Sequence, residues 1–145
     1  MPNAQWYRAG RKAVLEGSVS LESSSLKLAL LVPSHDPDLD EHQVFEDVDD
    51  DELDRAGYDA GGESITNRSF SYDSATDEHV FEAGDVLWDQ VTWTDPGVRY
   101  GVIYVDGSPA RLLMLVDFIT EREPDNQVFG LVWSPDGIAR LGLPD

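Results

Sequence analysis

The apolar residues of the chain are densest in two runs, 98–105 and 110–118, which are separated by a short turn. The first run is rich in β-branched and aromatic residues, which are typical of strands. The connection begins with Asp106 and Gly107, and Asp-Gly between two such runs is a strong hairpin signal. Pro109 favours a loop longer than two residues. We predict that the two runs form a central antiparallel pair, buried on at least one face.

The remaining strand patterns are short apolar or alternating runs, each bounded by Gly, Pro, Asp or Asn. They lie at 26–32, 63–73, 79–81, 86–94, 127–133 and 138–143. With the central pair they predict about seven strands or slightly more. The expected fold class is mainly β, as an antiparallel β-sandwich or a partly rolled sheet, in one domain that covers residues 1–145.

A short helix is predicted near the N-terminus. Apolar side chains follow helical spacing over 4–15, Asn3 is a candidate N-cap and Gly17 is a candidate stop. We therefore expect the helix within 1–17, packed against the predicted sheet.

A second segment, 34–54, is dense in Asp and Glu and contains no Lys or Arg. Its residues 42–54 fit a short helix, because Val44 and Val48 share one face of a helix. They fit equally an extended excursion held by Phe45. The sequence leaves both alternatives open.

The charge balance is the strongest global feature of the composition. The 145 residues include 29 Asp and Glu against 10 Lys and Arg, for a formal net charge of −19. Such a chain repels nucleic-acid phosphates, so we expect no direct nucleic-acid binding. Scarce lysine and excess acid suit high salt, because the Debye length falls to about 3 Å at 1 M and self-repulsion is screened. A halophilic protein and an ordinary acidic protein both fit this composition.

The sequence contains no cysteine and no membrane-spanning pattern. Without cysteine the chain has no disulfide and no thiolate metal ligand. The longest aliphatic run, 28–32, is too short to cross a bilayer. The first residues lack the apolar run of a secretion signal. We expect no membrane contact and no routing by an N-terminal signal.

Four aspartates approach the spacing of a calcium-binding loop: Asp36, Asp38, Asp40 and Asp47. The sixth position of such a loop requires Gly and holds Glu41 here, and the twelfth holds Asp in place of the usual Glu. We therefore favour a solvated acidic loop over a cation site.

Histidine and nucleophile patterns do not indicate catalysis. His35, His42 and His79 follow no metal-ligand spacing, so each is expected at the surface or half-buried. The chain has no Gly-x-Ser-x-Gly elbow, no GxGxxG and no Walker motif. We expect no enzyme activity, no bound metal and no cofactor.

Aromatic side chains are candidates for ligand binding. Trp88 and Trp93, with Tyr100 and Tyr104, form either a core or a platform for sugar rings. Their spacing on neighbouring predicted strands favours a core, and the sugar platform remains the alternative.

Basic residues of the N-terminal helix are candidates for an interface. Arg8, Arg11 and Lys12 are three of the 10 Lys and Arg residues of this acidic chain. Together with Trp6 they would dock on an acidic partner. The alternative, which we favour, is a terminal helix that packs Trp6 on its own domain and exposes the bases.

An ordered set of residues runs through nearly the whole chain. It comprises Trp-Tyr at 6–7, Ser-Ser-Leu-Lys-Leu-Ala-Leu-Leu at 24–31, Gly-Tyr-Asp-Ala-Gly-Gly at 57–62, Val-Leu-Trp at 86–88, Val-Thr-Trp at 91–93, Arg-Tyr-Gly-Val-Ile-Tyr at 99–104 and Leu-Val-Asp-Phe at 115–118. In this set the chain resembles a family of small structural proteins of tailed viruses of bacteria and archaea. The resemblance implies a non-enzymatic virion component. The lysine-poor composition suits a virus of a halophilic host.

The resemblance leads to a first hypothesis and one alternative, and the two tryptophans suggest a third interpretation of a different class. First, the chain is a decoration or cement protein that binds the major capsid protein on the head in many copies, as a homo-oligomer or symmetric assembly. Strand edges such as 127–133 would make the contact, and the acidic segment would face solvent. Alternatively, it is a neck or tail component: a connector, stopper or minor tail protein. A third interpretation is a carbohydrate-binding module for host attachment that uses Trp88 and Trp93. Both virion hypotheses imply assembly in the host cytoplasm and location in the virion.

Overall fold

The computed structural model describes residues 3–133 and 137–142. Its main sheet is antiparallel, with the strand order β1-β8-β7-β2-β3. These strands are β1 (Asn3–Trp6), β2 (Leu26–Leu31), β3 (Glu63–Ser64), β7 (Val98–Val105) and β8 (Leu112–Arg122). The predicted central pair is confirmed, because β7 and β8 are neighbours in the interior of this sheet.

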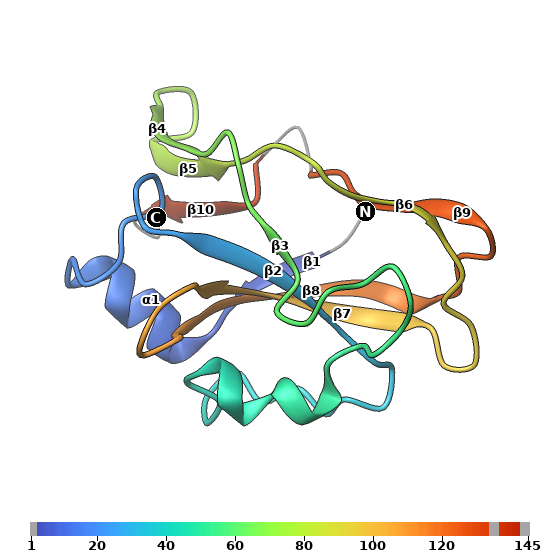
Figure 1. The fold of residues 1–145 in the computed structure, drawn as a ribbon. Helices are drawn as coiled ribbons and strands as arrows, with labels where there is room; N and C mark the ends of the chain where they lie inside the picture. The colour runs from blue at the N-terminus through green and yellow to red at the C-terminus, as the bar shows by residue number, and fades with distance from the viewer. Residues whose placement is uncertain (1–2, 134–136, 143–145) are drawn as a thin grey trace.

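Two smaller antiparallel sheets form a second layer over one face of the main sheet (Figure 1). One has the order β10-β5-β4, and in the other β6 pairs with β9. Their strands are β4 (Ser69–Asp73), β5 (Glu78–Glu82), β6 (Val86–Val91), β9 (Gln127–Leu131) and β10 (Ala139–Gly142). The mainly β, sandwich-like antiparallel fold predicted from the sequence is confirmed.

The central strands β2 and β7 of the main sheet are buried on both faces. In β2, Leu28 and Leu30 point into the core between the two layers. Ala29 and Leu31, which alternate with them, belong to a second cluster on the opposite face. Because both faces are covered, β2 has a nearly continuous apolar sequence instead of an alternating one.

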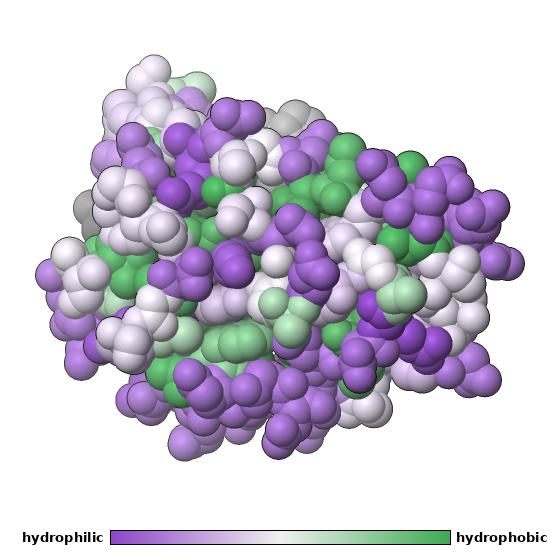
Figure 2. Space-filling view, in the orientation of Figure 1, coloured by the Kyte–Doolittle hydropathy of each residue, from purple (hydrophilic) through white to green (hydrophobic). Residues whose placement is uncertain are grey.

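The acidic segment 34–54 covers that opposite face of the main sheet (Figure 1). Val48 is buried there, and Leu39 and Phe45 pack against the same cluster. Most carboxylates of the segment are exposed, and the side that it occupies is predominantly hydrophilic in Figure 2. The segment contains two short 3-10 turns, η1 (Phe45–Asp47) and η2 (Asp49–Asp51). The segment is therefore not the short helix expected over 42–54. Phe45 holds it against the sheet, as in the alternative of an extended excursion, but the two turns interrupt the extended backbone.

The predicted start of the N-terminal helix is wrong. Residues 3–6 form β1, where Ala4 lies opposite Val116 of β8, so Asn3 is not an N-cap. The helix α1 (Arg8–Leu15) begins only after Tyr7. The reason is tertiary: β8 offers a free edge, and its main-chain hydrogen bonds outweigh the weak helical preference of these few residues. The predicted end is confirmed by Gly17, which has a φ of 84° just beyond the helix.

The strand predicted over 63–73 is also divided. β3 stops at Ser64, and the chain bends past Ile65 before β4 begins. Asn67 in the bend has a φ of 52°, which interrupts an extended strand.

Among the described residues, no helix has both the length and the apolar character that a membrane-spanning helix requires.

Candidate functional site

The outer strand of the second layer, β9, has an unpaired edge. Among the described residues β9 pairs with β6 alone. The sequence from Asn126 to Trp133 contains no charged residue, although the whole chain has a net charge of −19. Val128 and Val132 are 54% and 60% exposed. The strand predicted at 127–133 thus forms, and it presents an uncharged edge to solvent.

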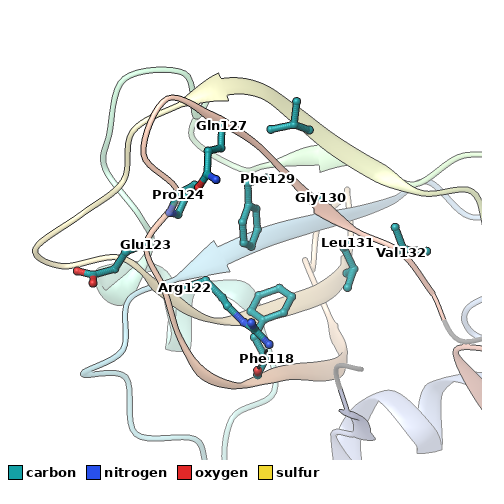
Figure 3. A pocket seen from close by; sticks show the side chains of 10 residues that line it. Phe118, Arg122, Glu123, Pro124, Gln127, Phe129, Gly130, Leu131 and Val132 are labelled. Atoms are coloured by element: carbon teal, nitrogen blue, oxygen red, sulfur yellow. Dashed lines mark hydrogen bonds between the residues drawn. The ribbon is translucent and has the colours of Figure 1, made fainter.

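A hollow of about 430 Å³ runs along this edge (Figure 3). Its lining includes every residue from Gln127 to Val132, and also Phe118, Arg122, Glu123 and Pro124. Consecutive residues of a strand point to opposite faces, so a hollow that touches all of them lies along the strand edge itself. We call this hollow, with the edge of β9, the β9 groove.

Aromatic packing holds the β9 groove in shape. Phe129 points inward from β9 and meets Phe118 of β8 edge to face, with ring centroids 5.5 Å apart. The same ring lies 5.6 Å from Trp93 and 6.0 Å from Trp88. An edge backed by such a cluster is pre-organised, and pre-organisation lowers the entropy that binding costs.

The burial of Trp88 and Trp93 in this cluster decides between the two roles that the sequence left open, a core and a sugar platform. Trp88 is 3% exposed and Trp93 is fully buried. The indole N–H of Trp93 donates to the carbonyl oxygen of Ala56 over 3.0 Å. The predicted core role of both residues is therefore confirmed, and neither ring face is available as a sugar platform in this fold.

A distortion of β8 brings two residues to the groove. Tyr100 of β7 pairs with Asp117, whereas Val98 pairs with Arg122, so β8 bulges between these two positions. Within the bulge Ile119 has a φ of 76°, and its N–H donates to the Asp117 carboxylate over 2.7 Å. The bulge directs Phe118 into the core and leaves Arg122 in the groove lining.

Arg122 is the cation of the groove. It is exposed, and its guanidinium donates to the carbonyl oxygen of Phe118 over 3.0 Å. Beside an uncharged edge, this guanidinium is free to meet a carboxylate of a bound segment. The sequence pattern did not single out Phe118, Arg122 or Pro124, because only the fold brings them to β9. The uncharged run of 126–133 was the signal visible in the sequence.

The four candidate cation ligands do not converge. Asp38 accepts the backbone N–H groups of Asp40 and Glu41, and Asp47 accepts those of Gln43 and Val44. The latter two hydrogen bonds lower the pKa of Asp47. Across residues 3–133 and 137–142 no three His, Asp or Glu side chains are placed to hold a metal ion. Asp38 and Asp47 therefore stabilise turns of the acidic segment, while Asp36 and Asp40 are exposed on it.

His35 is more buried than the surface or half-buried position that the sequence predicted. It is 4% exposed, and its Nδ1 lies 2.7 Å from a carboxylate oxygen of Asp51. Its ring centroid is 5.8 Å from that of half-buried His42 and 5.7 Å from that of Tyr100. His79 is exposed, as predicted, and stacks on Phe70. His35 is buried because the acidic segment folds back on the main sheet.

The predicted interface residues are divided between two elements. Trp6 is half-buried on β1 and packs against the core between the layers. Arg8, Arg11 and Lys12 are exposed on α1. The favoured alternative, packing of Trp6 on its own domain with exposed bases, describes this arrangement, although Trp6 belongs to a strand.

A hydrogen-bond network fastens the glycine-rich turn at 57–62 to the main sheet. Glu52 accepts from the Tyr58 hydroxyl over 2.6 Å and from the Gly61 N–H over 2.7 Å. Tyr58 in turn accepts the Leu30 N–H over 2.9 Å. The Tyr104 hydroxyl donates to the Gly61 carbonyl over 2.6 Å. These groups are satisfied within the fold, so their role is structural and the β9 groove remains the best candidate site.

No protein-family model matches the chain, and neither a curated protein nor a solved structure is significantly similar to it.

Proposed function

We propose that this protein is a non-enzymatic structural component of a tailed-virus particle, and that it binds a neighbouring virion protein through the β9 groove. The observation that carries the proposal is the uncharged, exposed edge of β9 in a chain of net charge −19. Soluble proteins usually protect such edges with charged residues or proline, since a bare edge pairs with other chains. An edge without this protection suits a protein whose edge is covered in its assembly.

The geometry favours an extended segment as the bound element. Such a segment adds a strand to β9, and main-chain hydrogen bonds supply affinity. Val128 and Val132 on the outer face offer apolar contacts for alternate side chains of the segment. Arg122 at the groove favours a segment that carries a carboxylate. A mainly apolar strand with one acidic residue is therefore the expected partner chemistry.

The viral context of the proposal comes from the ordered set of residues that resembles small structural proteins of tailed viruses. Within that context we propose a decoration or cement protein on the head, with the major capsid protein as the neighbour. A capsid surface repeats one binding site many times, which suits a small protein that presents an uncharged strand edge. The exposed carboxylates of 34–54 would then face solvent. A neck or tail component of the same particle is the alternative.

The copy number of the chain in purified particles separates these alternatives. Quantitative mass spectrometry gives it relative to the major shell protein. Hundreds of copies support decoration, whereas a dozen or fewer support a neck or tail ring. Absence of the chain from purified particles overturns the virion proposal.

A pair of matched variants tests the β9 groove itself. Val128→Lys places a charge on the edge, and Leu87→Lys places the same charge on β6, where Leu87 is 56% exposed but does not line the groove. Each tagged variant is produced in infected host cells with the virus. We expect V128K to enter particles at least about tenfold less than the unchanged chain, and L87K to enter normally. Equal incorporation of V128K and L87K contradicts the groove assignment.

A further inference from the structure

The helix α1 lies far from β9 in the fold (Figure 1), and it carries three exposed cations. Four arginines donate hydrogen bonds to oxygens of the same chain: Arg55, Arg68, Arg99 and Arg122. The side chains of five other cations have no hydrogen bond or ion pair with any described residue. Four of them lie around α1: Arg8, Arg11, Lys12 and Arg111. The fifth, Lys27, lies on β2. In a chain with 29 acidic residues, this concentration of free positive charge needs an explanation.

Side chains of both signs line one hollow beside α1. The hollow has a volume of about 360 Å³, and Arg8, Lys12 and Arg111 line it together with Asp40 and Glu41. Arg8 and Lys12 are four residues apart and therefore lie on one face of the helix. The helix start is fixed to the acidic segment, because the Arg8 N–H donates to the Leu39 carbonyl over 2.9 Å. Cations and carboxylates thus lie side by side on one rigid surface.

An exposed apolar side chain extends this surface. Leu15 is 69% exposed and lines the neighbouring hollow with Arg11 and Lys12. Arg11 and Leu15 are again four residues apart, so they form a second stripe along the helix. Leu15 lies beside charged side chains, so it would add apolar contact area to an interface formed by them.

We propose that this surface, which we call the α1 surface and define by Arg8, Arg11, Lys12, Asp40 and Glu41, binds the α1 surface of a second copy of the chain around a two-fold axis. A two-fold axis makes an interface self-complementary, since each contact occurs twice with the partners exchanged. Arg8 and Lys12 of one copy meet Asp40 and Glu41 of the other.

The mixed charge of the surface selects a second copy over other partners. A nucleic acid, or a uniformly acidic protein, would bring negative charge against Asp40 and Glu41 as well as against the bases. Like charges brought together across an interface are strongly unfavourable. A copy related by two-fold symmetry avoids this conflict, because each of its carboxylates faces a base. The inference is independent of the proposed function, since it concerns the isolated chain.

A charge-exchange experiment tests the dimer. One variant, R8E/K12E, leaves Arg11 as the only base of the α1 surface, and the other, D40K/E41K, replaces both of its carboxylates with bases. Sedimentation velocity over a range of concentrations is expected to show dimers for the unchanged chain. For each variant alone we expect the dimer dissociation constant to rise at least about tenfold. Circular dichroism checks that both variants fold.

The mixture of the two variants is the decisive sample. Every contact across a mixed dimer is attractive, so native mass spectrometry is expected to detect one copy of each variant in a restored dimer. Net charge alone predicts otherwise, because D40K/E41K is less negative than the unchanged chain and would associate more strongly. The control D49K/D50K makes the same change in charge on η2, outside the hollow, and is expected to dimerise normally. A monomeric unchanged chain, or a mixture that stays monomeric, overturns the proposal.

Discussion

The ring of Phe45 lies flat on the ring of Tyr104, with centroids 4.3 Å apart and planes 4° apart. This pair fastens the acidic segment to β7. The segment is rich in carboxylates that repel one another, so a few apolar anchors must hold it against the sheet. Phe45 is one of these anchors, together with Leu39 and Val48.

Replacing this anchor is expected to loosen the acidic segment. Phe45→Ala removes a half-buried ring from the second core and should cost about 2 kcal/mol of unfolding free energy. Urea denaturation measures the loss, and hydrogen exchange should show it concentrated in residues 34–54. The control Val132→Ala, at a 60% exposed position, is expected to change stability by less than about 0.5 kcal/mol. Equal effects of the two substitutions would contradict the anchoring role.

Alanine substitutions at two glycines with positive φ distinguish the cost of backbone strain from the cost of a steric clash. Gly62 has a φ of 81°, and a Cβ there would overlap the Leu28 carbonyl of β2. Gly17 has a φ of 84°, but a Cβ there meets nothing. Gly17→Ala should therefore cost only the left-handed conformation, about 1 kcal/mol.

Gly62→Ala adds a clash with β2 to the same conformational cost. We expect it to destabilise the protein by at least about twice as much as Gly17→Ala. Thermal unfolding of the two variants side by side gives the comparison. Similar losses at both positions would mean that the 57–62 turn does not approach β2 so closely.

The conformation of Ile119 predicts a stabilising substitution. A φ of 76° is unfavourable for a β-branched residue, and the side chain is 49% exposed, so little packing is lost on replacement. Ile119→Asn should raise the unfolding free energy by about 1 kcal/mol, because Asn tolerates this backbone region. Thr120→Asn, at the next residue, is the control and is expected to give no gain. A loss of stability in Ile119→Asn would show that its exposed side chain makes an essential contact.

The buried tyrosines predict an alkaline limit to stability. Burial raises the pKa of Tyr7 and of Tyr58 far above its ordinary value, and it raises the pKa of Tyr104 to about 12. The Glu52 carboxylate accepts a hydrogen bond from the Tyr58 hydroxyl, and this hydrogen bond raises the pKa of Tyr58 further. A raised folded-state pKa means that the fold favours neutral tyrosine. This stability is complete below the unfolded-state value, near pH 10, and is lost as the pH rises above it.

Absorbance at 295 nm and circular dichroism, recorded together from pH 9 upward, test this limit. We expect exposed Tyr72 to ionise while the fold persists, and the buried tyrosines to ionise only as the sheet signal disappears. Ionisation of all tyrosines near pH 10 with an unchanged circular dichroism spectrum would contradict the buried network.

Local patterns predicted the strands well because short apolar runs bounded by turn residues are typical of strands. The central pair 98–105 and 110–118 and the strand at 26–32 are apolar enough to be recognised without any partner. The turn at Gly17 was also visible, since few other residues adopt a positive φ freely. The uncharged run of 126–133 was in the sequence as well, but its location on an open edge depends on the pairing of β9 with β6.

The tertiary structure decided which of two plausible local structures each ambiguous segment adopts. Residues 3–6 have a helical pattern but pair with β8, because the sheet supplies hydrogen bonds that a short helix cannot match. His35 is buried because distant strands create the surface against which 34–54 folds.

The sequence by itself thus determined the fold class, the central hairpin and the acidic character of the chain, because these depend on the period and composition of neighbouring residues. Only the tertiary structure decided the β9 groove and the α1 surface. Phe118 and Arg122 meet β9, and Arg8 and Lys12 meet Asp40 and Glu41, through packing of elements that are distant along the chain. No local sequence pattern predicts such contacts, since they depend on how all the other elements are placed.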